Sequence, residues 1–400
     1  MNETVVKKNI FNYYLAHVFS GVSFILPITI LYYSSFGLSF FAIGSLESIF
    51  LLVALCLEIP TGVIADMVGR RRMSGLGMLL IATGTLIVGL GSTFFAFIFA
   101  QVLFGIGAAM RSGADTALMY DSLDTHNQAE RYSRVEGVSF ALFSIFGAVA
   151  APIGAWLFVI NRRLPFFLDA AFIAIAALLY GLMVEVRRPK SEPRFKPFKQ
   201  VFLEGIRDIA TKPIVGWYIA VTIFLSLIAA VFASLLNQPL LIANRLSVQE
   251  IGYLFVPVLV LQAIASVFAE KLEKRFKERI CLFVIILLPG ISLLLMGTNV
   301  TLLLLLGLFL FSGNRGFHYP IIKQFIQNRL NADTRATTLS IQNFIDSLAG
   351  IIFLPVFGFL LDSASIVTST RWIGAGALIV GLFLLLSRRR SQITGIFRRI

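Results

Sequence analysis

Residues 40–72 read FFAIGSLESIFLLVALCLEIPTGVIADMVGRRR, and this stretch decides the fold. Residues 40–66 form one long run that is mostly apolar, and three arginines, Arg70 to Arg72, follow it closely. The run is long enough to cross a lipid bilayer, for which a helix needs about 20 apolar residues. Basic residues beside such a run are typical of a cytoplasmic loop. The stretch therefore predicts a membrane-spanning helix that ends at the cytoplasmic surface.

The rest of the chain repeats this pattern. Of its 400 residues, 58% are hydrophobic and only 14% are charged, whereas soluble proteins carry about 25% charged residues. The composition predicts an all-α membrane protein with twelve transmembrane helices. The expected spans are residues 9–33, 40–66, 73–92, 95–121, 133–160, 164–185, 213–237, 247–270, 280–297, 300–323, 336–361 and 370–387.

The basic residues predict the topology. The chain has 34 Lys and Arg against 21 Asp and Glu, a net charge of +13. With both termini in the cytoplasm, the outer loops hold only Arg162, Arg163, Arg245 and Arg371, and most of the other basic residues lie inside. We therefore expect a multi-pass protein of the plasma (inner) membrane, surrounded by the lipid bilayer. Topology accounts for the positive charge, so we expect no nucleic-acid partner.

The longest polar stretch divides the chain into two halves. Residues 1–185 are expected to form an N-terminal six-helix bundle, and residues 213–400 a C-terminal six-helix bundle with a basic cytoplasmic tail. Between them, residues 186–212 form a cytoplasmic linker. Its apolar residues at helical spacing predict an amphipathic helix on the inner leaflet, and a simple tether is the alternative.

The two halves resemble each other at an offset of 203–204 residues. The Gly-x3-Asp that ends at Asp66 corresponds to the Ser-x3-Glu that ends at Glu270. Arg111 corresponds to Arg315, each within the fourth helix of its half. Two parallel six-helix repeats with a site between them are a transporter architecture. The fifth helices match through two residue pairs, which are Gly147 with Gly350 and Pro152 with Pro355.

The segment from Gly62 to Arg72, GVIADMVGRRR, resembles the loop 2–3 signature of the major facilitator superfamily, G-x-x-x-D-x-x-G-R-[RK]. The segment from Gly105 to Asp115, GIGAAMRSGAD, is similar to the fourth helix of bacterial drug-exporting members. Those members carry an Arg where this chain has Gln101, and only Gly147 and Pro152 match the helix 5 signature of antiporters. The resemblance implies two pseudo-symmetric six-helix bundles that transport a small molecule by alternating access.

The resemblance also implies a gate at the cytoplasmic end of the second helix. In the family, the acid that matches Asp66 caps helix 11 of the other half, and the acid that matches Asp121 holds the basic loop. Arg70, four residues after Asp66, can pair with it. The alternative is that the arginines only set the topology. The expected gating motif comprises Gly62, Asp66, Gly69, Arg70, Arg71 and Asp121.

Charged residues within the apolar runs are the next candidates, because charge at membrane depth is costly and rarely accidental. A carboxyl in such surroundings can load and release a proton, so Asp346, Asp115 and Glu58 are candidates for proton coupling. Two interpretations remain open. In the first, Arg111–Asp115 and Arg315–Asp346 are neutral pairs that hold helices together. In the second, substrate contacts in the central cavity come from Arg111, Arg315 and His318.

The fifth helix of each half carries residues that favour a bend. Gly and Pro loosen a helix, so we expect kinks that serve either close packing or the rocking of the bundles. The candidate kink residues are Gly147, Pro152, Gly350 and Pro355.

The sequence carries no Walker A motif, no H-E-x-x-H motif and no Cys/His cluster. We therefore expect no enzymatic activity, no cofactor and no bound metal. The function we favour is proton-coupled export of an amphipathic or drug-like small molecule by a protein that works as a monomer, with protons as the coupling ion. The alternative is proton-coupled uptake of a specific metabolite, for which an anion is one candidate class. An alternative from another class is a polytopic membrane enzyme or a non-transporting membrane partner.

Overall fold

The computed structural model describes residues 3–185, 213–276, 278–327, 329 and 332–397. These residues form helices joined by short loops and contain no strand. The expected linker and its amphipathic helix lie outside the described residues. Among these described residues, ten helices are long and apolar enough to cross a membrane. The two other expected spans coincide with α1 and α2 together and with α14. The all-α membrane fold is confirmed.

The chain divides into two compact units. Unit 1 consists of residues Met1–Leu38, Ser45–Glu192 and Ser247–Val256, and unit 2 of Ser39–Gly44, Pro193–Leu246 and Pro257–Ile400. Helices α3 and α12 each begin in one unit and continue in the other.

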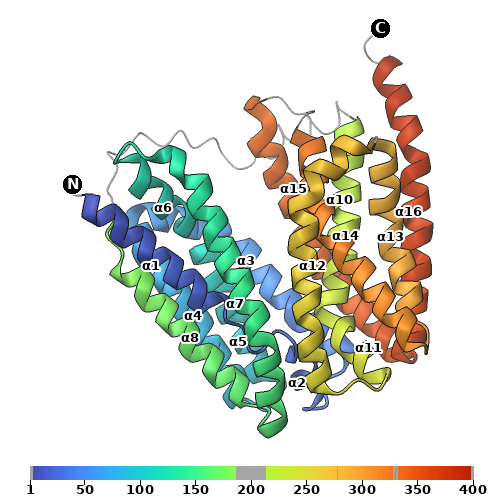
Figure 1. Cartoon of the computed structure of the whole chain (residues 1–400), viewed down its shortest axis with the longest axis horizontal. Coiled ribbons are helices and arrows are strands. Elements are labelled where there is room, and N and C mark those ends of the chain that lie inside the picture. The colour runs from blue at the N-terminus through green and yellow to red at the C-terminus, as the bar shows by residue number, and fades with distance from the viewer. Residues whose placement is uncertain (1–2, 186–212, 277, 328, 330–331, 398–400) are drawn as a thin grey trace. The chain divides into compact units, whose positions relative to one another are not determined.

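Unit 1 contains most of the first half of the chain. Helices α1, α4 and α8 lie side by side in it (Figure 1). Tyr13, Met119 and Tyr180 form part of its core and are nearly inaccessible to solvent. The elements are α1 (Glu3–Gly21), α2 (Thr29–Ser34), α3 (Phe40–Val68), α4 (Arg70–Leu90), α5 (Phe94–Arg111), α6 (Ala114–Asp124), the 3₁₀ turn η1 (Ala129–Arg131), α7 (Tyr132–Ile160) and α8 (Leu164–Leu182).

In unit 2, helix α13 packs against α14 and α16, and α10 against α15 (Figure 1). Tyr218, Leu282 and Ile285 form part of its core. The elements are α10 (Pro213–Val231), the π-helical turn η2 (Phe232–Leu236), α11 (Asn237–Ala243), α12 (Val248–Arg275), α13 (Glu278–Met296), α14 (Thr301–Gln327), α15 (Ala332–Ser363) and α16 (Ile366–Phe397).

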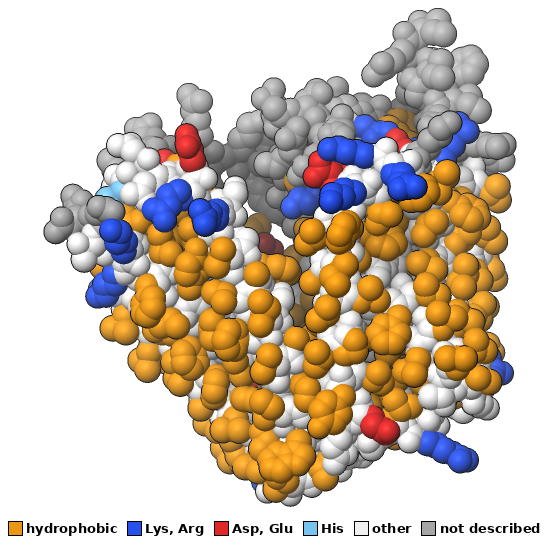
Figure 2. All heavy atoms as spheres, viewed as in Figure 1, with side chains coloured by type: hydrophobic (Ala, Val, Ile, Leu, Met, Phe, Trp, Pro, Cys, Tyr) orange, Lys and Arg blue, Asp and Glu red, His pale blue; other side chains and the backbone are white. Residues whose placement is uncertain are grey.

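The surface of each unit matches a lipid environment. On the face drawn in Figure 2, hydrophobic side chains cover the middle of each unit, and most of the visible Lys and Arg gather towards one end. Large apolar side chains are strongly exposed, among them Phe95 at 80% and Phe383 at 68%. Water would make such exposure costly, whereas lipid tails solvate these side chains.

The first expected span is not one helix, which corrects the sequence-based expectation for residues 9–33. Helix α1 ends at Gly21, and α2 begins only at Thr29. Pro27 explains part of the break, since its ring clashes with the carbonyl four residues earlier and it has no N–H to donate. The Asp169 carboxylate of α8 accepts the backbone N–H of Phe24 at 2.6 Å. The break is therefore held by a buried acid.

The fourth span is also divided. Helix α5 ends at Arg111 and α6 begins at Ala114, with Gly113 between them at φ +71°. By contrast, α7 and α15 continue as helices through Pro152 and Pro355. The proline positions therefore do not interrupt either helix.

Close packing of α7 requires glycine at position 154 and is tight at position 147. A Cβ atom at Gly154 would lie 1.8 Å from the Phe24 carbonyl oxygen, and one at Gly147 would lie 3.1 Å from the Gly21 carbonyl oxygen. Helix α7 thus approaches the broken first span with almost no side chain between the two backbones.

Replacement of Asp169 tests the break. Its carboxylate accepts the Phe24 N–H, so Asp169→Asn replaces a charged acceptor by a neutral amide. Hydrogen bonds to charged groups contribute about 1.5–3 kcal/mol, and we expect a loss of that size. The measurement is thermal unfolding of the purified protein in detergent.

The matched control is Asp362→Asn in unit 2. Asp362 accepts the N–H groups of Phe40 and Phe41 at 2.8 and 2.9 Å, but it is exposed. We expect its replacement to cost less than about 1 kcal/mol. Equal melting temperatures for Asp169→Asn and the wild type would contradict this account of the break.

Candidate functional site

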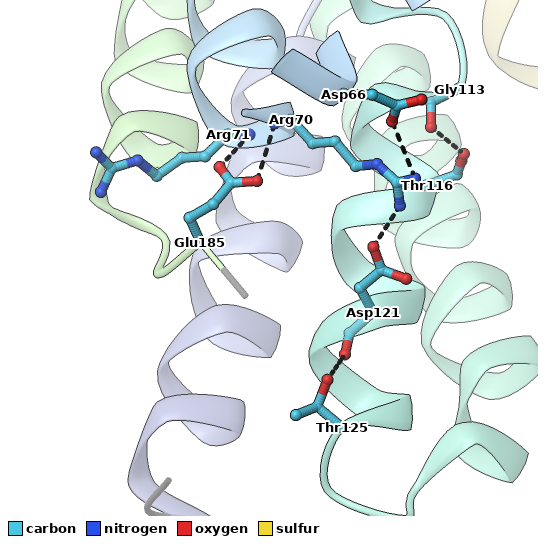
Figure 3. A network of polar contacts seen from close by, with 8 residues as sticks. All are labelled: Asp66, Arg70, Arg71, Gly113, Thr116, Asp121, Thr125 and Glu185. Atoms are coloured by element: carbon cyan, nitrogen blue, oxygen red, sulfur yellow. Dashed lines mark hydrogen bonds and ion pairs between the residues drawn. The ribbon is translucent and has the colours of Figure 1, made fainter. Parts of the chain in front are cut away.

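A network of charged side chains surrounds the N-terminus of α4 (Figure 3). The Glu185 carboxylate accepts the backbone N–H groups of Arg70 at 2.9 Å and Arg71 at 2.8 Å. These are among the groups that a helix start leaves without an intrahelical partner. The carboxylate also suits the positive end of the helix dipole. Glu185 therefore caps α4.

Gly69 permits this cap to form. Its φ of +108° is a conformation that other residues rarely adopt. A Cβ atom at this position would also lie 3.1 Å from the Glu185 carboxylate. The second glycine of the motif, Gly62, has no neighbour within 4 Å of such an atom among the described residues. Packing therefore requires a glycine at position 69 and not at position 62.

The Arg70 guanidinium joins two acids. It donates to Asp121 on α6 and, at 3.3 Å, to Asp66 on α3. The Asp121 side chain is only 8% exposed, whereas that of Asp66 is 61% exposed. Arg71 turns the other way (Figure 3), and its guanidinium donates to the Met183 carbonyl at 3.1 Å. Arg70 is thus anchored on Asp121, and its contact with Asp66 is the weaker one.

Arg111 and Asp115 form an ion pair across the break between α5 and α6. The Arg111 Nε atom lies 2.9 Å from the Asp115 Oδ2 atom. Asp115 also accepts the Thr116 N–H at 2.7 Å. Both charges are therefore compensated within unit 1.

A chain of polar groups lies close to this pair. The Tyr13 hydroxyl donates to Glu136 at 2.6 Å, and the His17 ring contacts the Tyr13 carbonyl at 2.8 Å. The His17 ring is also close enough to Arg111 and Asp115 to interact with their charges. Glu58, the third expected proton carrier, lies apart from these groups, exposed on α3.

In unit 2 the expected residues are dispersed. His318 on α14 is buried, with its ring 3.1 Å from the Asn314 carbonyl oxygen, whereas Arg315 is exposed. Asp346 on α15 is partly buried within reach of the Ser226 hydroxyl. No ion pair joins Arg315 to Asp346 in the described part of this unit. The neutral pair that one interpretation of the sequence requires is absent there.

Sequence reasoning missed the role of Glu185, which is the last residue of the expected sixth span. Its only sequence signal is a lone acid just before a basic stretch. Glu47 on α3 lines a pocket together with Tyr33 and Gln101. The sequence places Glu47 eleven residues before Glu58 in a mostly apolar run, but it does not show what surrounds it.

Comparison with known proteins gives the family. The model of the Major Facilitator Superfamily matches residues 13–244 and 224–396. "Multidrug resistance protein 1" of Bacillus subtilis is 28% identical over 183 residues, 45% of each chain. "Quinolone resistance protein NorA" of Staphylococcus aureus is 21% identical over 197 residues, 49% of each chain. The match thus spans about half the length of these curated relatives.

Solved structures share the fold over nearly the whole chain. A point mutant of the nucleoside transporter NupG has a TM-score of 0.78 at 12% identity, with 97% of this chain and 99% of that chain covered. A bacterial homologue of the human lysosomal transporter Spinster has a TM-score of 0.73 at 17% identity, with 98% of each chain covered. The chain is therefore a multi-pass membrane protein, and it belongs to the major facilitator superfamily.

Proposed function

We propose that this protein exports a small amphipathic compound across the plasma membrane in exchange for protons, working as a monomer with both termini in the cytoplasm. The observation that carries the proposal is the unequal sharing of Arg70 between Asp121 and the exposed Asp66. Alternating access needs contacts weak enough to open in each cycle. Exposed ion pairs contribute only about 0.2–1 kcal/mol.

The compensated Arg111 supports export over uptake of an anion. An arginine that binds an anionic substrate needs a free guanidinium, but Arg111 is paired with Asp115 at 2.9 Å. Two relatives whose names refer to resistance to drugs also support an amphipathic compound as the substrate.

Among the three expected proton carriers, the geometry favours Asp346. Asp115 is neutralised by Arg111, and Glu58 is exposed. Asp346 is partly buried, and no basic side chain pairs with it among the described residues. A proton is then the simplest means of compensating its charge.

Asp66→Asn tests the gate. The contact with Arg70 is long and exposed, so we expect the melting temperature to stay within about 1 °C of the wild type. We expect the transport rate in proteoliposomes to fall by more than about tenfold, since the exposed carboxylate is the group that can change partners.

Glu185→Gln is the matched comparison for Asp66→Asn. This change weakens the cap of α4, so we expect a loss of about 0.5–2 kcal/mol of stability. Asp66→Asn protein that transports at the wild-type rate would refute the gating role of Asp66.

Asp346→Asn tests proton coupling. Without a group that loads a proton, a pH gradient cannot drive accumulation, while exchange of substrate for substrate needs no proton. We therefore expect pH-driven accumulation to fall to the level seen without a gradient and exchange to persist. Both are measured with labelled substrate in proteoliposomes.

The control for this experiment is Asp362→Asn on the same helix, α15. It removes an equal charge from an exposed position whose carboxylate binds backbone N–H groups. Accumulation by Asp346→Asn protein equal to that of this control would exclude Asp346 as the proton site.

A further inference from the structure

Unit 1 contains a pocket of about 300 Å³ beside the break in the first span. Ile25 of the non-helical segment and Thr29 at the start of α2 contribute to its wall. Irregular backbone at membrane depth is tolerated where it is buried in protein or lines a cavity. Discontinuous helices in transporters often adjoin the binding site. The pocket therefore adjoins a helix break of the kind that borders binding sites in transporters.

The wall of this pocket is aromatic, with one acid. Tyr33, Phe50, Phe104 and Phe166 contribute rings to it. Glu47 is the only residue with a carboxylate or a basic group among the described residues that line it. It is the eighth residue of α3, so it lies roughly 10 Å along the helix from its start. We call this cavity the Glu47 pocket.

Among the described residues, the Glu47 carboxylate has no countercharge. Its side chain is partly buried, so it is also partly removed from water. The polar neighbour Gln101 is buried, with 4% of its surface exposed, and carries no charge. Burial of an uncompensated charge is costly, so a partner from outside the chain would stabilise the ionised form.

Other acids of unit 1 show how unusual this is. Asp115 and Asp121 each pair with an arginine. Asp169 and Glu185 each accept backbone N–H groups. The fold thus compensates these acids with its own groups, whereas Glu47 has no partner of this kind in the described part of the chain.

We propose that the Glu47 pocket binds the charged head of a hydrophobic organic ammonium ion. Glu47 supplies the opposite charge, and the aromatic rings supply apolar contact and cation–π attraction. The inference rests on the proposed export of amphipathic compounds and names their class.

The size and chemistry of the pocket favour an organic ammonium over a metal ion. Hard metal ions require six or more oxygen ligands, whereas this wall offers few oxygens among many carbon atoms. A volume of about 300 Å³ lies at the lower end of the range for drug-sized ligands. A compact amine with one aromatic ring matches both properties.

Binding of two isosteric probes tests the proposal. The probes are (4-hydroxyphenyl)trimethylammonium and its uncharged counterpart 4-tert-butylphenol, titrated calorimetrically into the purified full chain in nanodiscs. We expect the wild type to bind the cation at least about tenfold more tightly than the phenol. Glu47→Gln should lower the affinity for the cation by at least about tenfold and leave that for the phenol unchanged.

Three further variants keep the result interpretable. Glu130→Gln removes an equal charge from an exposed position in unit 1, and we expect no effect on either affinity. Glu47→Asp retains the charge and should retain the preference for the cation. Ala108→Met fills the pocket from α5 and should weaken both probes.

Two outcomes would overturn the proposal. Equal affinity of the wild type for both probes would show an apolar cavity without charge selection. Cation binding that survives both Glu47→Gln and Ala108→Met would place the ligand elsewhere. Because equilibrium binding requires no transport, a protein that binds the cation as expected but fails to export it would refute the proposed function alone.

Discussion

The cost of holding an ionised carboxylate away from water governs this structure. A chain that exposes its apolar side chains to lipid must compensate its buried charges from within. The Asp169 carboxylate does so through backbone N–H groups that the broken first span leaves free. Asp115 and Asp121 do so through arginines. Each solution fixes a break or a helix end, so the polar contacts determine where the apolar helices stop.

Both units hold one end of their third expected span to their sixth with a charged group. In unit 1 the acid lies at the end of the sixth span, whereas in unit 2 the acid lies at the start of the third. In unit 1, Glu185 follows α8 and binds the N-terminus of α4, where the side chains are arginines. In unit 2, Glu278 begins α13, and Arg388 near the end of α16 pairs with it. Arg329 adds a second partner at 2.9 Å. Each unit thus joins the third and sixth expected spans of its half at one end, by an ion pair or a charged hydrogen bond.

A further correspondence follows the sequence offset of 204 residues. Asp66 pairs with Arg70 at 3.3 Å, and Glu270 pairs with Lys274 at 2.6 Å. In both pairs the acid is exposed and the basic residue follows it by four positions. The repeat seen in the sequence therefore extends to local contacts.

Much of the fold could be predicted from the sequence, because a span is a local property of apolar length. The broken spans could not, since the contact that holds residues 22–28 joins Phe24 to Asp169, 145 positions away. The candidate site could be predicted only in part. The pairing of Arg70 with Asp66 was expected from their separation of four residues, but the cap by Glu185 and the isolation of Glu47 depend on which helices pack together.

The acids that lack a partner define the chemistry available for coupling. Glu47 in unit 1 and Asp346 in unit 2 have no basic partner among the described residues. Each must be neutralised by something mobile, and a cationic substrate and a proton are the two mobile charges that the proposed exchange involves. If one conformation stabilises such an acid only when its ligand is bound, binding of that ligand shifts the equilibrium between the conformations. Placing the two acids in different units lets each respond to its own ligand, and the differential affinity of the states for those ligands then sets the coupling.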